Sequence, residues 1–299
     1  MVSNEIVVFD KKAIKRNRLR ATNNFNEHDF LHRWSKNHLL DRLSDVTRNF
    51  SNGLCIGSRC PIGANDHDKI AHTSVMDITP SSITPCEPPY IIADEEFLPI
   101  APGSLDLVIS NLNLHNVNDL PGTLLQIRQA LQNDGLFLAS ILGGETLHEL
   151  RSAMMQTEMD LYGGVSPRIA PFADKPQMGD LLQRAGFALP VVDSDIVTVT
   201  YDNIFKLMKD LRGMAEGNVV AERRKTFDSK EFFMRVAERY QHEFAESDGR
   251  IVASFEVIFL LGWAPDASQQ KPLPRGSAKH SLAEALGSKE YKTGDKATP

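Results

Sequence analysis

Apolar residues recur at helical spacing across residues 26–50, and this pattern predicts an amphipathic helix there. Short apolar runs follow, each about the length of a buried strand, with one amphipathic stretch among them. They predict strands at 53–57, 72–79, 88–96, 104–114 and 135–142, and a helix at 119–134. Because strands that alternate with helices pair in parallel through crossover connections, the first half of the chain predicts an open parallel sheet.

The second half of the chain keeps this alternation only at first. Helices are expected at 144–162, 178–187, 203–215 and 229–246, and strands at 190–201 and 250–264. The two late strands lack the simple alternation, so we expect an antiparallel pairing, with the helices of 202–249 forming a cap over one end of the sheet. The composition then turns to Ser, Lys, Pro and Gly. We expect one α/β domain over residues 1–266 and a flexible tail over 267–299.

The charge balance narrows the classes of partner. The 299 residues carry 33 Lys and Arg against 39 Asp and Glu, a net charge of −6, which disfavours a nucleic-acid binder. The cationic run "KKAIKRNRLR" at 11–20 is interpreted as a solvated helix face in preference to a patch for an acidic partner. No apolar run reaches the length of a membrane span, so we expect no integral membrane segment.

The cysteines favour neither a disulfide framework nor a zinc site. Cys55, Cys60 and Cys86 are three in number, and the first two lack a second ligand pair. The opening residues "MVSNEIVVFD" do not have the basic-then-apolar layout of a signal peptide. A cytoplasmic location is therefore the expectation.

Polar residues end several of the predicted strands. Gly57 ends the first strand, Asp77 the second, and Asn111 the fourth, while Asp94 and Glu95 follow the third. Because ligands bind at the carboxyl ends of parallel strands, and an acidic residue about 20 positions beyond a glycine turn holds a ribose, these residues predict an adenosine-type ligand. Each alone has an ordinary alternative, since Asp77 could cap a helix and loop acids are mostly solvated. No phosphate-loop motif is present, which disfavours a nucleoside triphosphate.

Several longer segments resemble the class I S-adenosylmethionine-dependent methyltransferases, and most of all the mitochondrial complex I assembly factor 5 family. They are "ADEEFLPIAPGSLDLVISNLNLHNVNDLP", "QALQNDGLFLASILGGETLHELR", "GGVSPRIAPFAD", "LMKDLRGMAEGN" and "GWAPDASQQKPLPRGSA". The resemblance implies a Rossmann-like fold with a mostly parallel seven-stranded sheet, an antiparallel last strand and a helical cap. It also implies S-adenosylmethionine as cofactor and a respiratory complex I subunit as partner.

The glycine loop departs from the pattern of this family. In "LCIGSRCPIG" the motif D-x-G-x-G-x-G keeps Gly57, but Cys55 replaces the acid, and Arg59 and Pro61 replace the later glycines. An arginine side chain there would occupy space that the cofactor normally uses, and its charge would lie beside the sulfonium. The proline removes a backbone donor. The departures put cofactor binding in doubt.

His115, at the end of "NLNLHN", is the candidate catalytic residue. A neutral histidine suits the removal of a proton from a nucleophile near pH 7, although a structural histidine is the commoner case. Asp119 is expected to cap the helix at 119–134. The sequence shows no 2-His-1-carboxylate triad, so no metal site is expected.

Three functions remain open. The first is action on a protein substrate in complex I assembly, either as a methyltransferase or, as the resemblance implies, as an arginine hydroxylase. The second is a small-molecule carboxyl methyltransferase of the malonyl-ester type. The third is a non-catalytic assembly protein whose cofactor loop is degraded, which the residues Arg59 and Pro61 motivate.

Overall fold

The structure is a computed structural model that describes residues 7–80, 89–270, 277 and 280–289. The chain divides into two compact units, Met1–Pro265 and Asp266–Pro299. In the second unit the described residues contain one short helix, α8 (Leu282–Ala285). The tail expected over 267–299 falls partly outside the described residues, as do Cys86 and the first six residues.

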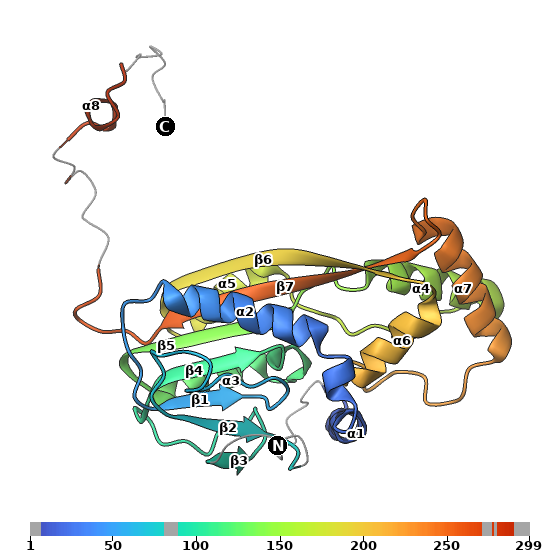
Figure 1. Cartoon of the computed structure of the whole chain (residues 1–299), viewed down its shortest axis with the longest axis horizontal. Helices are drawn as coiled ribbons and strands as arrows, with labels where there is room; N and C mark the ends of the chain where they lie inside the picture. Colours follow the sequence, from blue (N-terminus) through green and yellow to red (C-terminus); the bar gives the residue numbers. More distant parts are fainter. Residues whose placement is uncertain (1–6, 81–88, 271–276, 278–279, 290–299) are drawn as a thin grey trace, which may run out of the picture. The chain divides into compact units, whose positions relative to one another are not determined.

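The first unit is built on one seven-stranded sheet with the strand order β3-β2-β1-β4-β5-β7-β6 (Figure 1). Strands β1 to β5 pair in parallel, and β7 is antiparallel to both of its neighbours. The mostly parallel sheet with an antiparallel last strand is therefore confirmed. The strands are β1 (Gly53–Ile56), β2 (Thr73–Asp77), β3 (Tyr90–Ile92), β4 (Leu105–Asn111), β5 (Leu131–Leu142), β6 (Ala188–Tyr201) and β7 (Ile251–Trp263).

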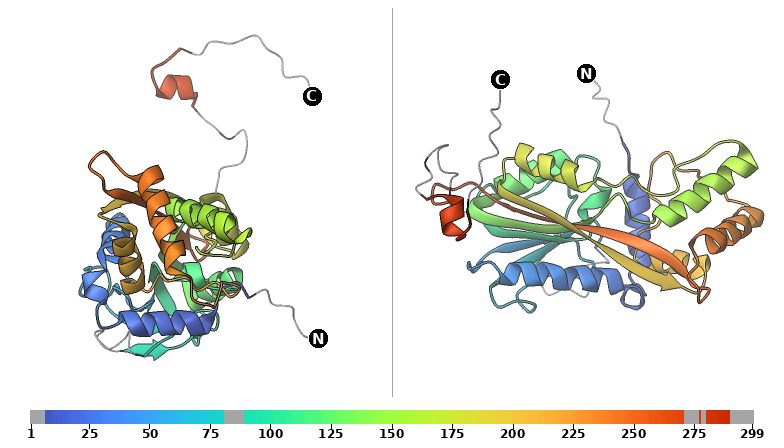
Figure 2. Two further views of the ribbon diagram at one scale, coloured as in Figure 1. Left: turned by 90° about the vertical axis from the view of Figure 1, so that its right-hand side faces the viewer. Right: turned by 90° about the horizontal axis from the view of Figure 1, so that it is seen from above.

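Helices cover both faces of this sheet, with α2 on one face and α3 and α5 on the other (Figures 1 and 2). Successive residues of β4 point to opposite faces, so Leu107 and Ile109 pack with the α2 side while Val108 packs with the α3 side. All of β4 is buried. A strand buried on both faces needs an apolar run, which is why this strand was predictable. The helices here are α2 (Phe30–Ser44), α3 (Leu120–Ala130) and α5 (Lys175–Arg184).

Strands β6 and β7 are long and extend past the other strands toward a group of helices (Figures 1 and 2). These helices are α4 (His148–Tyr162), α6 (Ile204–Gly213) and α7 (Lys230–Phe244), and we call the three together the cap. Phe232, Val236 and Tyr240 of α7 are buried, and the Tyr240 hydroxyl donates to the carbonyl of Val252 at 2.7 Å. The cap is thus fastened to β7 by both apolar and polar contacts.

The amino-terminal helix α1 (Lys11–Ala21) begins at Asp10, whose carboxylate accepts bonds from the backbone N–H groups of Lys12 and Ala13. The solvated face expected for the cationic run is only partly correct, because Arg18 is buried against two carboxylates. A run of like charges shows where cations lie in the chain but not which of them meets an acid from a distant segment.

Three predicted boundaries differ from the structure. The helix expected over 26–50 is shorter, since Phe25–Glu27 forms a separate 3₁₀ turn before α2. Strand β3 has three residues rather than nine, as befits an edge strand with one partner. Strand β5 starts at Leu131, directly after α3. Asp119 caps α3 as expected, with its carboxylate accepting from the N–H of Gly122.

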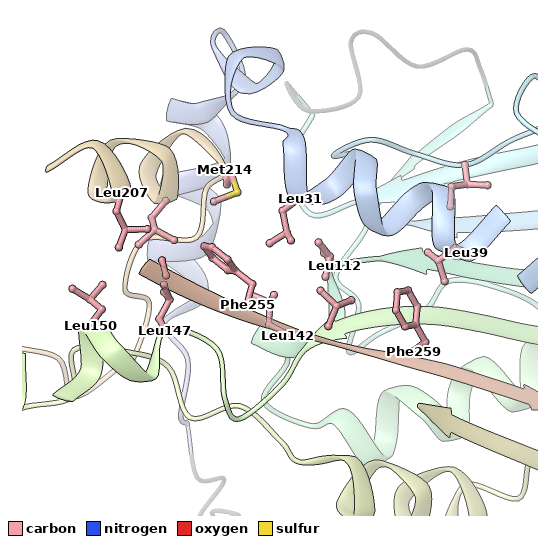
Figure 3. Packing of buried hydrophobic residues seen from close by; sticks show 14 of the residues in the cluster. Leu31, Leu39, Leu112, Leu142, Leu147, Leu150, Leu207, Met214, Phe255 and Phe259 are labelled. Atoms are coloured by element: carbon pink, nitrogen blue, oxygen red, sulfur yellow. The ribbon is translucent and has the colours of Figure 1, made fainter. Parts of the chain in front are cut away.

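Phe255 of β7 lies at the centre of the apolar cluster that joins the sheet to the cap (Figure 3). We expect Phe255→Ala to lower the free energy of unfolding by about 3–5 kcal/mol, because the cavity left in a packed core is not refilled. Urea denaturation measures this change. The fully exposed Phe227 supplies the control, and Phe227→Ala should change stability by less than about 0.5 kcal/mol. Equal effects of the two substitutions would contradict the assignment of this core.

Candidate functional site

The turn after β1 is the predicted nucleoside-binding loop. Gly57 has a φ of +99°, in the region that favours glycine, and a Cβ there would lie 2.8 Å from the side chain of Asn113. Its N–H donates to the carbonyl of Met76 at 2.8 Å, so the turn is fixed to β2. The buried sulfur of Cys55, at the position of the family acid, accepts the N–H of Ile62 at 3.4 Å. Gly57 therefore forms a tight and fixed turn.

Asp77, at the end of β2, is fully buried beside this turn. One carboxylate oxygen accepts from the N–H and hydroxyl of Ser58, and the other accepts from the N–H and hydroxyl of Thr79. Arg18 adds a further bond at 3.2 Å. Burial alone would raise the pKa of Asp77, but Arg18 and the bonds from Ser58 outweigh it and lower the pKa to about 2.

The two acids after β3 differ in their partners and in their burial. Glu95 is buried and accepts from Arg18 at 2.9 Å and from the side-chain amide of Asn113 at 2.8 Å. Asp94 instead pairs with Lys11 at 2.7 Å and is partly exposed. Arg18 thus brings together Asp77 and Glu95, while Asp94 lies with a different cation.

The Asn111 side chain, at the end of β4, is hydrogen-bonded to other segments of the protein. Its amide donates to the carbonyls of His32 and Cys60 at 3.0 and 3.2 Å, and its oxygen accepts from Ser140 at 3.3 Å. These contacts join α2, the glycine turn and β5. The residue therefore positions the walls of the site.

The Arg59 side chain turns toward the cap. Its guanidinium donates to Glu216 at 2.6 Å and to the carbonyls of Met214 and Leu112 at 2.7 and 3.0 Å. Glu216 also contacts Nε2 of His115 at 3.0 Å through its second oxygen. Burial would raise the pKa of Glu216, but His115 and Arg59 offset it and hold the pKa well below its ordinary value. His115, Arg59 and Glu216 thus form one buried cluster.

Two cavities adjoin this cluster. The turn cavity, about 480 Å³, lies between the ends of α1 and α2 and residues 58–61. The cap cavity, about 210 Å³, is lined mainly by apolar residues, with Glu216 among its polar ones. Figure 3 shows Leu31, Leu147 and Phe255 meeting near it from α2, the start of α4 and β7. Because Arg59 lines the turn cavity and Glu216 lines the cap cavity, their ion pair lies between the two.

Several buried polar atoms near this boundary have no hydrogen-bond partner among the described residues. They include both ring nitrogens of His32, Nδ1 of His115 and Nε of Arg59. Burial, and next the charge of Arg59, lower the pKa of His32 well below its ordinary value, so this ring is neutral. Unpaired buried polar groups are costly and mark places where a ligand or water supplies the missing bonds.

Sequence reasoning missed Arg18, His32 and Glu216. Each acts through contacts with segments far along the chain, and nothing in the local pattern separates them from neighbouring charged residues. The one usable signal was Arg59, because a buried arginine in a turn requires a carboxylate partner somewhere.

Comparisons with known proteins identify the family. Residues 63–139 match the family model described as a methyltransferase domain. The chain is 36% identical over 286 residues to "Arginine-hydroxylase NDUFAF5, mitochondrial" of Danio rerio, covering 93% of this chain and 89% of the relative. It is 37% identical to the human protein of that name, covering 86% and 76% of the two chains. The chain belongs to the NDUFAF5 family.

A second group of relatives is more partial. The malonyl-[acyl-carrier protein] O-methyltransferase of Xylella fastidiosa (strain M23) is 38% identical over 193 residues, which cover 64% of this chain and 62% of that protein. Among solved structures, the YcgJ protein of Bacillus subtilis aligns with a TM-score of 0.52 at 13% identity, covering 77% of this chain and 100% of that chain. The structural likeness shows the fold alone, and the NDUFAF5 relatives decide the family.

The cytoplasmic expectation is wrong. The NDUFAF5 relatives from D. rerio and Homo sapiens are named as mitochondrial, which contradicts a cytoplasmic location. That expectation came from the few cysteines, which indicate a reducing environment and do not distinguish between compartments that share one.

Two further observations concern the described residues alone. No helix among them is long and apolar enough to cross a membrane. Nor do they bring together three or more His, Cys, Asp or Glu side chains in a group that could hold a metal ion.

The methyltransferase-domain match supports S-adenosylmethionine as the cofactor, and the structure fits such a nucleoside in part. The turn at Gly57 and the adjoining cavity suit it. The carboxylates of Asp77 and Glu95 do not suit a nucleoside in this arrangement, because both are already bonded to Arg18. The ligand and Arg18 therefore need the same acceptors.

We expect Asp77→Asn to lower the free energy of unfolding at pH 7 by about 2 kcal/mol, the amount linked to the lowered pKa. A carboxyl with a lowered pKa stabilises the fold above about pH 4 and loses this effect as the pH falls toward 2. The difference between parent and variant should therefore shrink between pH 5 and pH 2, as urea denaturation at several pH values can show. A difference that stays constant over this range would argue against a charged Asp77.

The Arg59–Glu216 pair can be tested by a double-mutant cycle. Removing either partner leaves the other buried without its counter-charge in this ion pair, so Arg59→Met and Glu216→Gln should each cost about 3–5 kcal/mol. The double variant should cost less than the sum of the two. Asp193→Asn, which breaks an exposed pair with Arg42, is the control and should cost less than about 1 kcal/mol. Additive losses at Arg59 and Glu216 would contradict a direct interaction.

Proposed function

We propose that the protein modifies an arginine side chain of a partner protein, using S-adenosylmethionine as its cofactor, during the assembly of respiratory complex I. The name of the NDUFAF5 relatives, arginine-hydroxylase, supports the substrate group. The resemblance of the sequence to the complex I assembly factors supports the partner. Hydroxylation and methylation both remain within this proposal, because both require an arginine to be bound and oriented. Methylation would transfer the methyl group of S-adenosylmethionine to a guanidinium nitrogen, with loss of a proton and release of S-adenosylhomocysteine. Hydroxylation would in addition need dioxygen and a two-electron reductant from outside the chain.

One observation carries the choice of an arginine. The cap cavity is walled mainly by apolar side chains, and the carboxylate of Glu216 lies on its wall. Its 210 Å³ is far above the ~10–15 Å³ that one water molecule needs, so the cavity has room for a side chain. The apolar stem and cationic end of an arginine side chain match the two kinds of lining.

We propose different roles for Glu216, which lines this cavity, and for His115, which lies behind it. Glu216 accepts the guanidinium of the substrate, since a carboxylate binds guanidinium through charge-assisted hydrogen bonds. His115 is held at Nε2 by Glu216, has an Nδ1 that is buried without a partner among the described residues, and serves as the proton acceptor for the substrate.

Two arginines line the same cavity. The charge of Arg168 is balanced by Glu158 and Asp228, and the guanidinium of Arg212 donates to the carbonyl of Met208.

We propose that Gly57, Asp77, Glu95 and Asn111 form the cofactor site in different ways. Gly57 gives the turn, Asp77 and Glu95 provide acceptors for a nucleoside, and Asn111 fixes the surrounding segments. The cofactor supplies the reactive group when it is bound. Asp94, which pairs with Lys11, would act only by holding α1.

The non-catalytic alternative has a specific observation in its favour, namely the commitment of Asp77 and Glu95 to Arg18. A chain whose nucleoside acceptors are permanently bonded would serve as a binding protein. The malonyl-ester alternative has only the shorter match in its favour.

The deciding experiment is mass spectrometry of complex I subunits from cells that express the parent chain, Glu216→Gln or no protein. The proposal expects one arginine to gain an oxygen or a methylene with the parent only, and Glu216→Gln to reduce this gain by at least about tenfold. The control is Glu222→Gln, at an exposed residue that does not line the cavity. Subunits that are unmodified with the parent, yet captured by it, would support the binding protein.

A further inference from the structure

Arg18 of α1 occupies the acidic end of the nucleoside site. Its Nη1 lies 3.2 Å from Asp77 and 2.9 Å from Glu95, which come from the ends of β2 and β3. All three residues are at least 95% buried, with relative exposures of 4%, 0% and 5%. The interaction is therefore a built feature of the interior, and not a surface ion pair.

Asp77 has no acceptor capacity left for a ligand. Five donors already bond its two oxygens, from Ser58, Thr79 and Arg18. A carboxylate offers about four lone-pair sites. Four of these bonds come from the backbone N–H and hydroxyl groups of Ser58 and Thr79, in the loops after β1 and β2. The fifth comes from the long side chain of Arg18 on α1. Arg18 is therefore the donor that a ribose hydroxyl could replace.

We propose that Arg18 is an internal cation that competes with the nucleoside ligand for Asp77 and Glu95. The ligand binds when the guanidinium leaves these carboxylates, so the measured affinity is lowered by the small fraction of molecules in which Arg18 is displaced. This inference rests on the cofactor named in the proposed function. It concerns ligand binding alone and does not depend on the substrate.

Release of Arg18 requires its end of α1 to move. Arg18, Ala21 and Thr22 form one wall of the turn cavity, so the ligand enters beside this end of the helix and the guanidinium must leave with it. The start of α1 is held separately, by the ion pair of Asp10 with Arg223 and the bridge of Phe9 with Val220. The far end of the helix can therefore move while its start remains fixed.

Asn17, which precedes Arg18 in α1, connects the release of Arg18 to the segment after α6. The Asn17 side chain donates to the carbonyl of Gly217 at 3.2 Å, directly beside Glu216. A shift of α1 that releases Arg18 therefore also disturbs the segment that holds Arg59 and His115. Occupation of the nucleoside site is in this way communicated to the cap cavity.

The test is calorimetric titration of S-adenosylhomocysteine and S-adenosylmethionine into the full chain and two variants. Arg18→Met removes the cation and keeps a long side chain, and we expect both ligands to bind at least about tenfold more tightly. Arg16→Met, on the exposed side of the same helix, is the matched control and should leave affinity unchanged. Weaker binding by a folded Arg18→Met would show that Arg18 holds the ligand and would overturn the proposal.

Because Arg18→Met leaves two buried acids unpaired, a second measurement uses the parent chain alone. Amide hydrogen exchange of α1 should become faster at saturating S-adenosylhomocysteine, since displacement of Arg18 loosens the end of the helix. Unchanged or slower exchange there would overturn the proposal, as would absence of binding to every variant at millimolar ligand. Arginine modification of a partner with an unchanged α1 would refute this inference and leave the proposed function standing.

Discussion

Glu216 is the residue on which the arrangement of the site depends. Its carboxylate holds Arg59 from the turn after β1 and His115 from the segment after β4, and it belongs itself to the segment after α6. A buried carboxylate is stable only with such partners, because removal from water is costly. One carboxylate therefore joins the segments after β1, β4 and α6. The two cavities lie on either side of it.

The altered glycine turn is consistent with this arrangement. An arginine in place of a loop glycine adds a charge beside the expected cofactor, but Glu216 balances the charge and draws the side chain away toward Met214 and Leu112. The loop is thus changed in chemistry and intact in backbone, since Gly57 keeps its positive φ. The same holds at β2, where Asp77 remains at the strand end but bonds to a cation of the chain itself. The motif therefore differs in its residues, while the backbone of the site keeps its arrangement.

The sequence was sufficient for the sheet because burial on both faces requires apolar strands. It predicted β4 and β5 as such runs, and the cap of α3 at Asp119 through a contact three residues away. It could not single out Arg18 among the cations of its helix, because the acids that bury it lie 59 and 77 residues away. Glu216 was missed for the same reason, with partners at separations of 157 and 101 residues. The local pattern of the sequence determines which face of a helix or strand is buried. Ion pairs between distant segments depend on the completed fold.

The attachment of α1 has a consequence for how the chain folds. Its first residues bridge to Val220 and Arg223, and the bond from Arg223 to Asp10 spans 213 positions. During synthesis the start of this helix can first meet Asp94 and Asn118, whereas its contacts with Val220 and Arg223 must wait until the carboxyl-terminal half of the domain has left the ribosome. Contacts across such long separations are slow to form. The acids that pair with Lys11 and Arg18 are translated before residues 220–223, so the cations of this helix can be paired before its start is fixed.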